Sequence, residues 1–154
     1  ASRIADLLRR PFIDMDALIV DKEKQSINNI FASKGEPYFR HVEKTVLDEI
    51  AKKNAGVVAT GGGVVLNPDN MQRMKESGVV IYLKAPTDVL YLRLKNKKDR
   101  PLLKVERPQD KLESLLRARS GLYEKADYAV ETGGKAPHEV AESIIDLLTL
   151  EKKI

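Results

Sequence analysis

Cysteine is absent from the 154-residue sequence, and histidine occurs only twice, at His41 and His138. Without cysteine there are no disulfide bonds and no thiolate metal sites, which fits a reducing cytoplasm. The wide sequence separation of the two histidines argues against a histidine-based metal site. No apolar run approaches the about 20 residues that span a bilayer, and no basic-then-apolar export signal is present. We therefore expect a cytoplasmic protein without a membrane partner.

Aromatic residues are also scarce, at 5% of the sequence, while the net charge is +4. Such a charge suits nucleic acid, a membrane surface or small anions. Because no basic cluster is interleaved with aromatic residues, stacking on single-stranded nucleic acid is poorly supported. We expect small anionic ligands and no nucleic-acid partner. The hydrophobic share of 42% and the length predict one folded domain, residues 1–154.

Short apolar runs alternate with helical patterns along the chain. Strands are predicted at residues 11–14, 56–60, 79–83 and 127–131. Helices are predicted at residues 2–10, 16–25 (with Asp16 as N-cap), 26–35, 37–53, 67–78, 86–94, 108–126 and 137–153. The charged, proline-bracketed residues 96–108 are typical of a mobile loop. The alternation predicts an α/β fold with a parallel sheet, in which ligands bind at the carboxyl ends of the strands.

Two carboxylates stand at the end of the first predicted strand, Asp14 and Asp16. Residues two apart on an extended strand face the same way, so both could enter one cleft. One carboxylate could then steady a hydrated magnesium ion while the other polarises a substrate hydroxyl. The alternative is that Asp16 only caps the helix that follows.

Three arginines are candidates for binding anions. Arg40 and Glu43 are one helical turn apart, and the residues alone favour an ordinary surface ion pair. The simplest interpretation of Arg119 is likewise a solvent-exposed residue on the surface of a helix. Arginine is nevertheless the best side chain for gripping a planar carboxylate, and two of them from two helices would suit one substrate carboxylate. Arg100 precedes Pro-Leu-Leu in the charged loop, where an apolar anchor would let it reach transferring phosphate.

Three adjacent glycines, Gly61, Gly62 and Gly63, follow the strand predicted at 56–60. They do not form a Walker A loop, because no lysine follows them as G-x-x-x-x-G-K-[ST] requires. They do not fit G-x-G-x-x-G either. A plain strand-to-loop turn remains an alternative, although three consecutive residues without side chains are more than one tight turn needs.

In combination the motifs resemble those of the shikimate kinase family, small P-loop kinases of aromatic amino acid biosynthesis. The resemblance runs from residue 1 to about residue 150 and keeps the family's order and spacing. It rests on F-I-D-M-D (12–16), I-F-A-S-K-G-E-P-Y-F-R-H-V-E (30–43), A-T-G-G-G-V-V (59–65), R-P-L-L (100–103) and R-x-x-L-Y (119–123). It implies a three-layer α/β/α fold of the nucleoside monophosphate kinase type. It also implies an enzyme, expected to be monomeric, that transfers the γ-phosphate of ATP to the 3-hydroxyl of shikimate with Mg²⁺.

The resemblance implies a role for each substrate-side residue. Asp16 would bind the shikimate hydroxyls and help to activate the attacking one, and Asp14 would contact magnesium through water. Arg40 and Arg119 would hold the shikimate carboxylate. Glu43 would orient Arg40 or contact substrate indirectly. Residues 15–43 would form the shikimate-binding subdomain.

The remaining implied roles concern the glycines and ATP. The glycine triplet 61–63 would let the backbone approach the substrate ring, with Gly62 the expected donor. Arg100 would touch the ATP phosphates from a lid at residues 95–107 and act in catalysis. Arg93 would lie beside the adenine, and Lys135 in a loop on the same side.

One family element is absent from the sequence: the first strand and its G-x-x-x-x-G-K-[ST] loop. That element would cradle the β-phosphate and supply the central strand of the sheet, so we expect a gap in the middle of the sheet. Two explanations remain. We expect that roughly 20 preceding residues of the parent enzyme are missing from this sequence. The alternative is a non-catalytic shikimate- or partner-binding module that has lost the loop. Gluconate kinase and nucleoside monophosphate kinases share the fold but lack the motif set.

Overall fold

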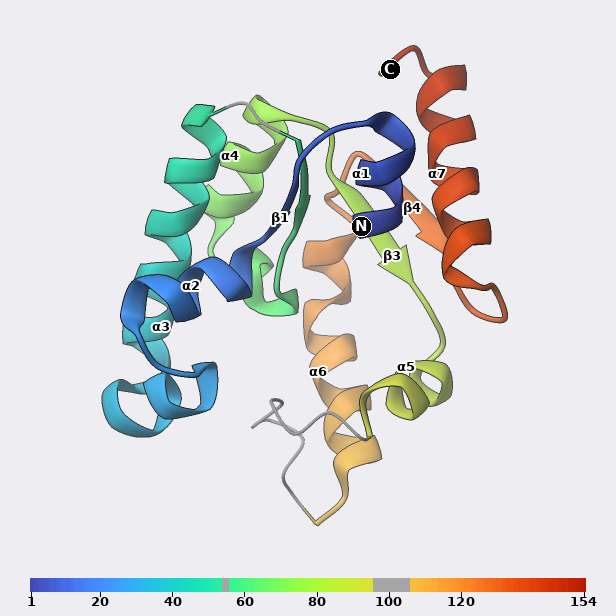
Figure 1. The fold of residues 1–154 in the computed structure, drawn as a ribbon. Coiled ribbons are helices and arrows are strands. Elements are labelled where there is room, and N and C mark those ends of the chain that lie inside the picture. The colour runs from blue at the N-terminus through green and yellow to red at the C-terminus, as the bar shows by residue number, and fades with distance from the viewer. Residues whose placement is uncertain (54–55, 96–105) are drawn as a thin grey trace.

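The computed structural model describes residues 1–53, 56–95 and 106–154 (Figure 1). The strands in these ranges are β1 (Phe12–Asp14), β2 (Val57–Ala59), β3 (Ile81–Lys84) and β4 (Tyr128–Glu131). The helices are α1 (Ser2–Leu8), α2 (Met15–Glu23), α3 (Ile27–Lys53), the 3-10 helix η1 (Gly62–Leu66), α4 (Pro68–Ser77), α5 (Thr87–Leu94), α6 (Pro108–Tyr123) and α7 (Pro137–Leu150).

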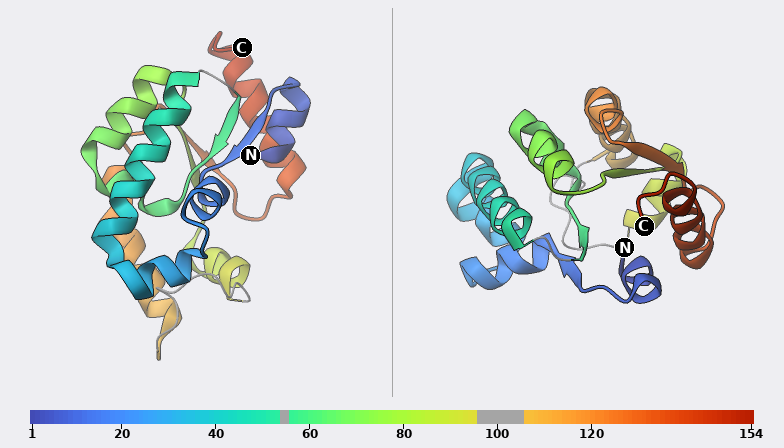
Figure 2. Two further views of the ribbon diagram at one scale, coloured as in Figure 1. Left: turned by 60° about the vertical axis from the view of Figure 1, so that its left-hand side comes forward. Right: turned by 90° about the horizontal axis from the view of Figure 1, so that it is seen from above.

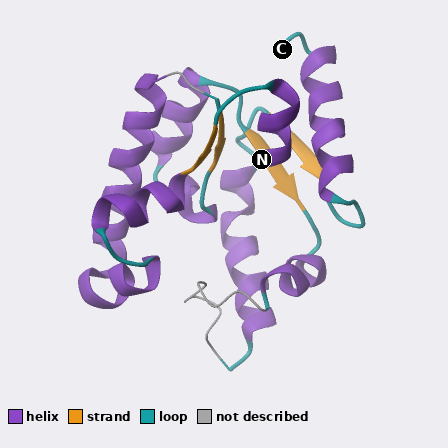
Figure 3. Ribbon diagram, in the orientation of Figure 1, coloured by secondary structure: helices purple, strands orange, loops and turns teal. Residues whose placement is uncertain are grey.

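All of the strand pairing in the described residues is parallel, as predicted. β1 pairs with β2, with Phe12 opposite Val57, and β3 pairs with β4, with Ile81 opposite Tyr128. The two pairs form separate two-stranded sheets, which agrees with the gap expected in the middle of the sheet (Figure 3). In the view from above, α3 and α4 lie on one side of the strands and α1 and α7 on the other (Figure 2). The fold is therefore of the expected α/β class, with helices on both sides of parallel strands.

Two hydrophobic cores lie on either side of the strands. The larger core joins α2, α3, η1 and α4 through Met15, Ile19, Ile30, Phe39, Val42, Val46, Leu47, Ile50, Val64, Val65 and Met71. The smaller core packs α1 and α7 against β4 through Ile4, Val130, Ala141, Ile144 and Leu148. Both cores follow the helical spacing of apolar residues seen in the sequence. No helix in the described ranges is long and apolar enough to cross a membrane.

Local chemistry explains the start of α4 and the break within α3. Asn67 caps α4 by accepting the Asp69 backbone N–H at 3.0 Å, and Pro68 occupies its first turn, as predicted. α3 contains a break at Gly35, whose φ of 84° and ψ of 169° are not helical. This break separates the two helices predicted at 26–35 and 37–53, and Ser26 accepts the Asn29 N–H at 3.1 Å as the predicted cap.

Two predicted details are wrong, and one element was not predicted. Asp14, rather than Asp16, is the N-cap of α2 and accepts the backbone N–H groups of Asp16 and Ala17. The cap moved because the helix begins directly where β1 ends. No helix or strand was predicted at the glycines and the apolar residues after them, and the 3-10 helix η1 forms there. β3 begins at Ile81, two residues later than predicted.

Candidate active site

The ends of β1 and β2 bring the predicted substrate-side residues together. β1 ends at Asp14, and Asp16 lies in the first turn of α2. β2 ends at Ala59, so the glycine loop begins at the neighbouring strand end. Parallel neighbouring strands end at the same edge of a sheet, where α/β folds bind their ligands. The sequence motifs at 14–16 and 61–63 therefore share one site.

Arg40 of α3 is held between two carboxylates. Its Nη1 donates to both Glu43 oxygens, at 3.1 and 3.3 Å, while its Nε and Nη2 donate to Glu36 Oε1 at 3.3 and 3.2 Å. The Glu43 side chain is only 2% exposed, whereas Glu36 is 47% exposed. The surface ion pair that the residues alone favoured is thus wrong, because the Glu43 partner is buried. Burial makes this pair a fixed part of the site.

The environment of Glu43 raises the pKa of its carboxyl above the usual value. Burial is the largest cause, since it disfavours the charged form. The Arg40 charge and hydrogen bond act in the opposite direction, Asp16 adds to the increase, and Arg119 lowers the pKa. Two cations and two carboxyl groups, from α2, α3 and α6, therefore act on one another around this buried position.

Each glycine of the triplet faces a different side chain of the site. A Cβ on Gly61 would lie 3.4 Å from Asp16 Oδ1 and 3.7 Å from Glu43 Oε2. A Cβ on Gly62 would lie 3.1 Å from the Tyr123 hydroxyl. A Cβ on Gly63 would overlap the Arg40 guanidinium.

The backbone conformation does not by itself require these glycines. Among the described glycines, positive φ angles occur at Gly35, Gly56 and Gly134, outside the triplet. At Gly63 the Arg40 guanidinium occupies the space where a Cβ would stand, at Gly62 the Tyr123 hydroxyl leaves little room for one, and at Gly61 a Cβ would meet only ordinary contacts. A plain strand-to-loop turn does not account for that.

Sequence reasoning missed Tyr123 and Glu36. The Tyr123 hydroxyl donates to the Gly62 carbonyl at 2.7 Å, and its ring stacks on Tyr82 with centroids 5.0 Å apart. The available signal was the spacing: Tyr123 stands four residues after Arg119 and therefore on the same face of α6. Glu36 likewise stands four residues before Arg40.

The ATP-side candidates gather at the other pair of strands. Arg93 of α5 donates to the side-chain and backbone oxygens of the buried Thr132, at 3.0 and 2.9 Å. Thr132 in turn donates to the Lys84 carbonyl at 2.8 Å, which ties α5 to the ends of β3 and β4. Lys135 is exposed in the same loop, and its backbone N–H donates to the Thr132 carbonyl at 3.3 Å. Arg100 and most of the predicted lid lie outside the described residues.

The magnesium prediction concerns Asp14 alone. In the described parts of the chain, no three His, Cys, Asp or Glu residues gather as a metal cluster. Asp14 is exposed, and both of its capping hydrogen bonds use Oδ1. A single exposed carboxylate fits an ion that keeps its water shell, as Mg²⁺ usually does.

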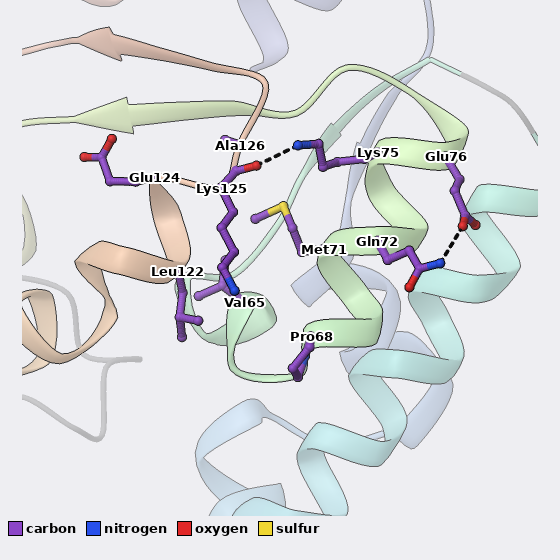
Figure 4. A pocket seen from close by; sticks show the side chains of 10 residues that line it. All are labelled: Val65, Pro68, Met71, Gln72, Lys75, Glu76, Leu122, Glu124, Lys125 and Ala126. Carbon is purple, nitrogen blue, oxygen red and sulfur yellow. Dashed lines mark hydrogen bonds between the residues drawn. The ribbon is translucent and has the colours of Figure 1, made fainter.

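A groove of about 730 Å³ lies next to this site, between α4 and the end of α6 (Figure 4). Val65, Met71 and Leu122 form part of its wall, and Lys75 at its rim donates to the Lys125 carbonyl at 2.9 Å. None of the predicted site residues lines it. The candidate active site therefore rests on the cluster around Glu43.

Comparison with known proteins gives a consistent result. A sequence model of the family described as shikimate kinase matches residues 1–149. The chain is 44% identical to a shikimate kinase of Thermodesulfovibrio yellowstonii, over 92% of this chain and 82% of the relative. A shikimate kinase of Caldanaerobacter subterraneus subsp. tengcongensis is 41% identical, over 93% and 84%.

Solved structures agree with the sequence comparison. The shikimate kinase from Acinetobacter baumannii in complex with shikimate superposes with a TM-score of 0.95 at 39% identity, covering 98% of this chain and 85% of that one. The shikimate kinase from Aquifex aeolicus superposes with a TM-score of 0.82 at 38% identity, covering 97% and 86%.

Proposed function

This chain belongs to the shikimate kinase family, and from that premise we propose how its residues bind and phosphorylate shikimate. The proposed reaction moves the γ-phosphate of ATP to the 3-hydroxyl of shikimate. The observation that carries the proposal is the cluster of Asp16, Arg40, Glu43 and the glycine triplet at the ends of β1 and β2. Residues 15–43 would supply most of the shikimate-binding surface.

Arg40 and Arg119 would hold the shikimate carboxylate. The Nη1 atom of Arg40 is fixed by buried Glu43, which leaves its Nε and Nη2 edge aimed at Glu36. That edge is the part of a guanidinium that grips a carboxylate with two parallel hydrogen bonds. Glu36 is half-exposed, so a substrate carboxylate could replace it at low cost. Arg119 lies close enough for its charge to act on Glu43 and would add the second cation.

Asp16 would bind the ring hydroxyls and accept the proton of the attacking one. Its Oδ1 lies next to the position where Gly61 lacks a Cβ, so the carboxylate and the glycine backbone face the same space. The Gly62 backbone would contact the substrate ring there. A positioned carboxylate is the usual means of orienting a hydroxyl nucleophile in phosphoryl transfer.

The nucleotide and metal assignments are also proposals. Magnesium bound to ATP phosphates would neutralise the charge that develops on the transferring group. Asp14 would steady it through its water shell, and Arg93, fixed by Thr132, would lie beside the adenine with Lys135. Arg100 would touch the phosphates, although it lies outside the described residues. None of the 154 residues belongs to a Walker A motif, so the cradle for the β-phosphate is not among these assignments. We expect a monomer acting in the cytoplasm.

The direct test is shikimate-dependent ADP formation by the protein that the natural gene encodes, with ATP and Mg²⁺. We expect turnover that requires shikimate. Shikimate binding without any turnover would instead support the non-catalytic module, and absence of both would refute the proposed function.

The substrate grip has its own kinetic test. Arg40→Ala and Arg119→Ala should raise the KM for shikimate far more than the KM for ATP, because the lost contacts are with the carboxylate. Arg73→Ala is the matched control, since Arg73 pairs only with the surface residues Asp48 and Glu76 among the described residues. Equal effects on both KM values would show that the assignment of the two arginines is wrong.

A further inference from the structure

The space beside Gly63 is occupied by the guanidinium of Arg40, which the proposed function assigns to the substrate carboxylate. Gly63 is buried in η1, and a Cβ built on it would overlap Nη1, Nη2 and Cζ of Arg40. The overlap involves three atoms of the guanidinium and not one protruding atom. The Nη1 and Nη2 end of the Arg40 side chain therefore lies directly against the backbone of residue 63.

Space, rather than backbone conformation, demands glycine at this position. Gly63 is not among the described glycines with positive φ. An L-residue could therefore adopt its backbone angles without strain. Gly56 is the opposite case, with a φ of 86° that disfavours any side chain. Alanine at position 63 would therefore leave the chain path acceptable and push on Arg40.

Arg40 would lose its present contacts if it moved away from residue 63. Nη1 is bonded to buried Glu43, Nε and Nη2 are bonded to Glu36, and the guanidinium lies 5.2 Å from the Phe39 ring centroid. Moving the guanidinium away from residue 63 separates it from a carboxylate that cannot follow, since the Glu43 side chain is 2% exposed. The guanidinium of Arg40 is thus enclosed by Glu43, Glu36, Phe39 and the backbone of Gly63.

We propose that Gly63 is a positioning residue that sets the place of the Arg40 guanidinium, so that a side chain at position 63 removes the arginine's grip on the substrate carboxylate. The proposal rests on the proposed function, in which Arg40 binds that carboxylate. It gives the third glycine a role distinct from backbone contact with the substrate ring.

A double-mutant cycle on shikimate affinity tests the proposal. Gly63→Ala should weaken the Kd for shikimate by at least about tenfold, which corresponds to about 1.4 kcal/mol. In the Arg40→Ala background the same change should alter the Kd by less than about twofold, because the displaced group is already gone. Gly78→Ala is the matched control, since a Cβ there meets nothing within 4 Å, and it should leave the Kd unchanged.

A second measurement reports the position of the Arg40 guanidinium in the absence of substrate. If Gly63→Ala displaces Arg40, the Glu43 carboxyl loses its cation, and its pKa measured by carbon-13 NMR should rise above that of the wild type. If Gly63→Ala alone does not fold, the double variant with Arg40→Ala should be as stable as Arg40→Ala alone, because it has no overlap. A double variant clearly less stable than Arg40→Ala alone would overturn the proposal.

The remaining outcomes distinguish the positioning role of Gly63 from the proposed binding of the substrate carboxylate by Arg40. A Gly63→Ala effect that persists undiminished without Arg40 would overturn the positioning role, as would an unchanged Glu43 pKa in the folded variant. An Arg40→Ala variant that binds shikimate normally would instead refute the proposed carboxylate grip, while the NMR measurement still decides where the guanidinium lies.

Discussion

Removing Arg40 should destabilise the protein in a way that depends on pH. Arg40→Ala removes the cation that is hydrogen-bonded to the buried Glu43 carboxylate, while Asp16 continues to raise the pKa of Glu43 and Arg119 continues to lower it. A buried charge that has lost its partner is costly, so the carboxyl should take up a proton in the folded state. The free energy needed to protonate Glu43 sets an upper limit on the stability that is lost.

The limit follows from the ordinary glutamate pKa of 4.5. At about pH 7.5, three pH units higher, neutralising the carboxyl costs about 4 kcal/mol, at about 1.36 kcal/mol per unit. At about pH 5.5, one unit higher, it costs about 1.4 kcal/mol. The part of the destabilisation caused by Glu43 should therefore not exceed about 4 kcal/mol at the higher pH and about 1.4 kcal/mol at the lower.

The sign follows from the direction of the shift. A carboxyl whose pKa is raised in the folded state stabilises folding below its unfolded pKa, and this stability is lost as pH rises through the folded pKa. Arg40→Ala raises that folded pKa further, so its free energy of unfolding should fall more steeply with pH than that of the wild type. Urea denaturation at both pH values measures the difference.

Two controls isolate the cause. Adding Glu43→Gln to Arg40→Ala removes the buried charge and should abolish the pH dependence of the loss. Arg73→Ala breaks an exposed ion pair with Asp48, 3.6 Å long, and should cost less than about 1 kcal/mol at either pH. Equal destabilisation by Arg40→Ala at the two pH values would refute the claim that a buried, charged Glu43 depends on Arg40.

Three further predictions concern the surroundings of this pair. Glu36→Gln should tighten shikimate binding several-fold in a calorimetric titration, because it removes the charge that competes for Arg40; weaker binding would show that Glu36 supports the grip. Gly56→Ala should lower the free energy of unfolding by more than about 1 kcal/mol, since φ is 86° and a Cβ would overlap the Pro11 carbonyl. Tyr123→Phe should cost about 0.5–1.5 kcal/mol of stability through its lost hydrogen bond to the glycine loop, and an unchanged melting temperature would contradict that.

The sequence predicts well those features of the fold that depend on neighbouring residues in the chain. Asn67 and Pro68 define the start of α4 through capping and a preset φ, and both act as expected. The cap of α2 was misplaced because Asp14 and Asp16 are equally good capping residues. Which one caps depends on where β1 stops pairing with β2, and that is a tertiary property. The 3-10 helix η1 was not predicted, because its short run of glycines and apolar residues carries neither a capping residue nor a helical period.

The site was predictable as a set of residues but not as a geometry. Arg40 and Glu43 one turn apart look like any surface pair, and only packing of α3 against its neighbours makes Glu43 buried. The reason for the bare glycines was equally hidden, because the Arg40 guanidinium and the Tyr123 hydroxyl come from elements remote from them in sequence. The proposed roles come from the resemblance of the ordered motifs, and the structure shows which of these residues contact one another.

The central claim is that Arg40 recognises the carboxylate of shikimate, and the most direct measurement compares shikimate with its methyl ester. Calorimetric Kd values for both compounds should show that the wild type prefers the acid by at least about tenfold, a difference of about 1.4 kcal/mol. Arg40→Ala should reduce that preference to about twofold or less, chiefly by weakening binding of the acid. A wild type that binds acid and ester equally, or an Arg40→Ala variant that keeps the full preference, would contradict the account.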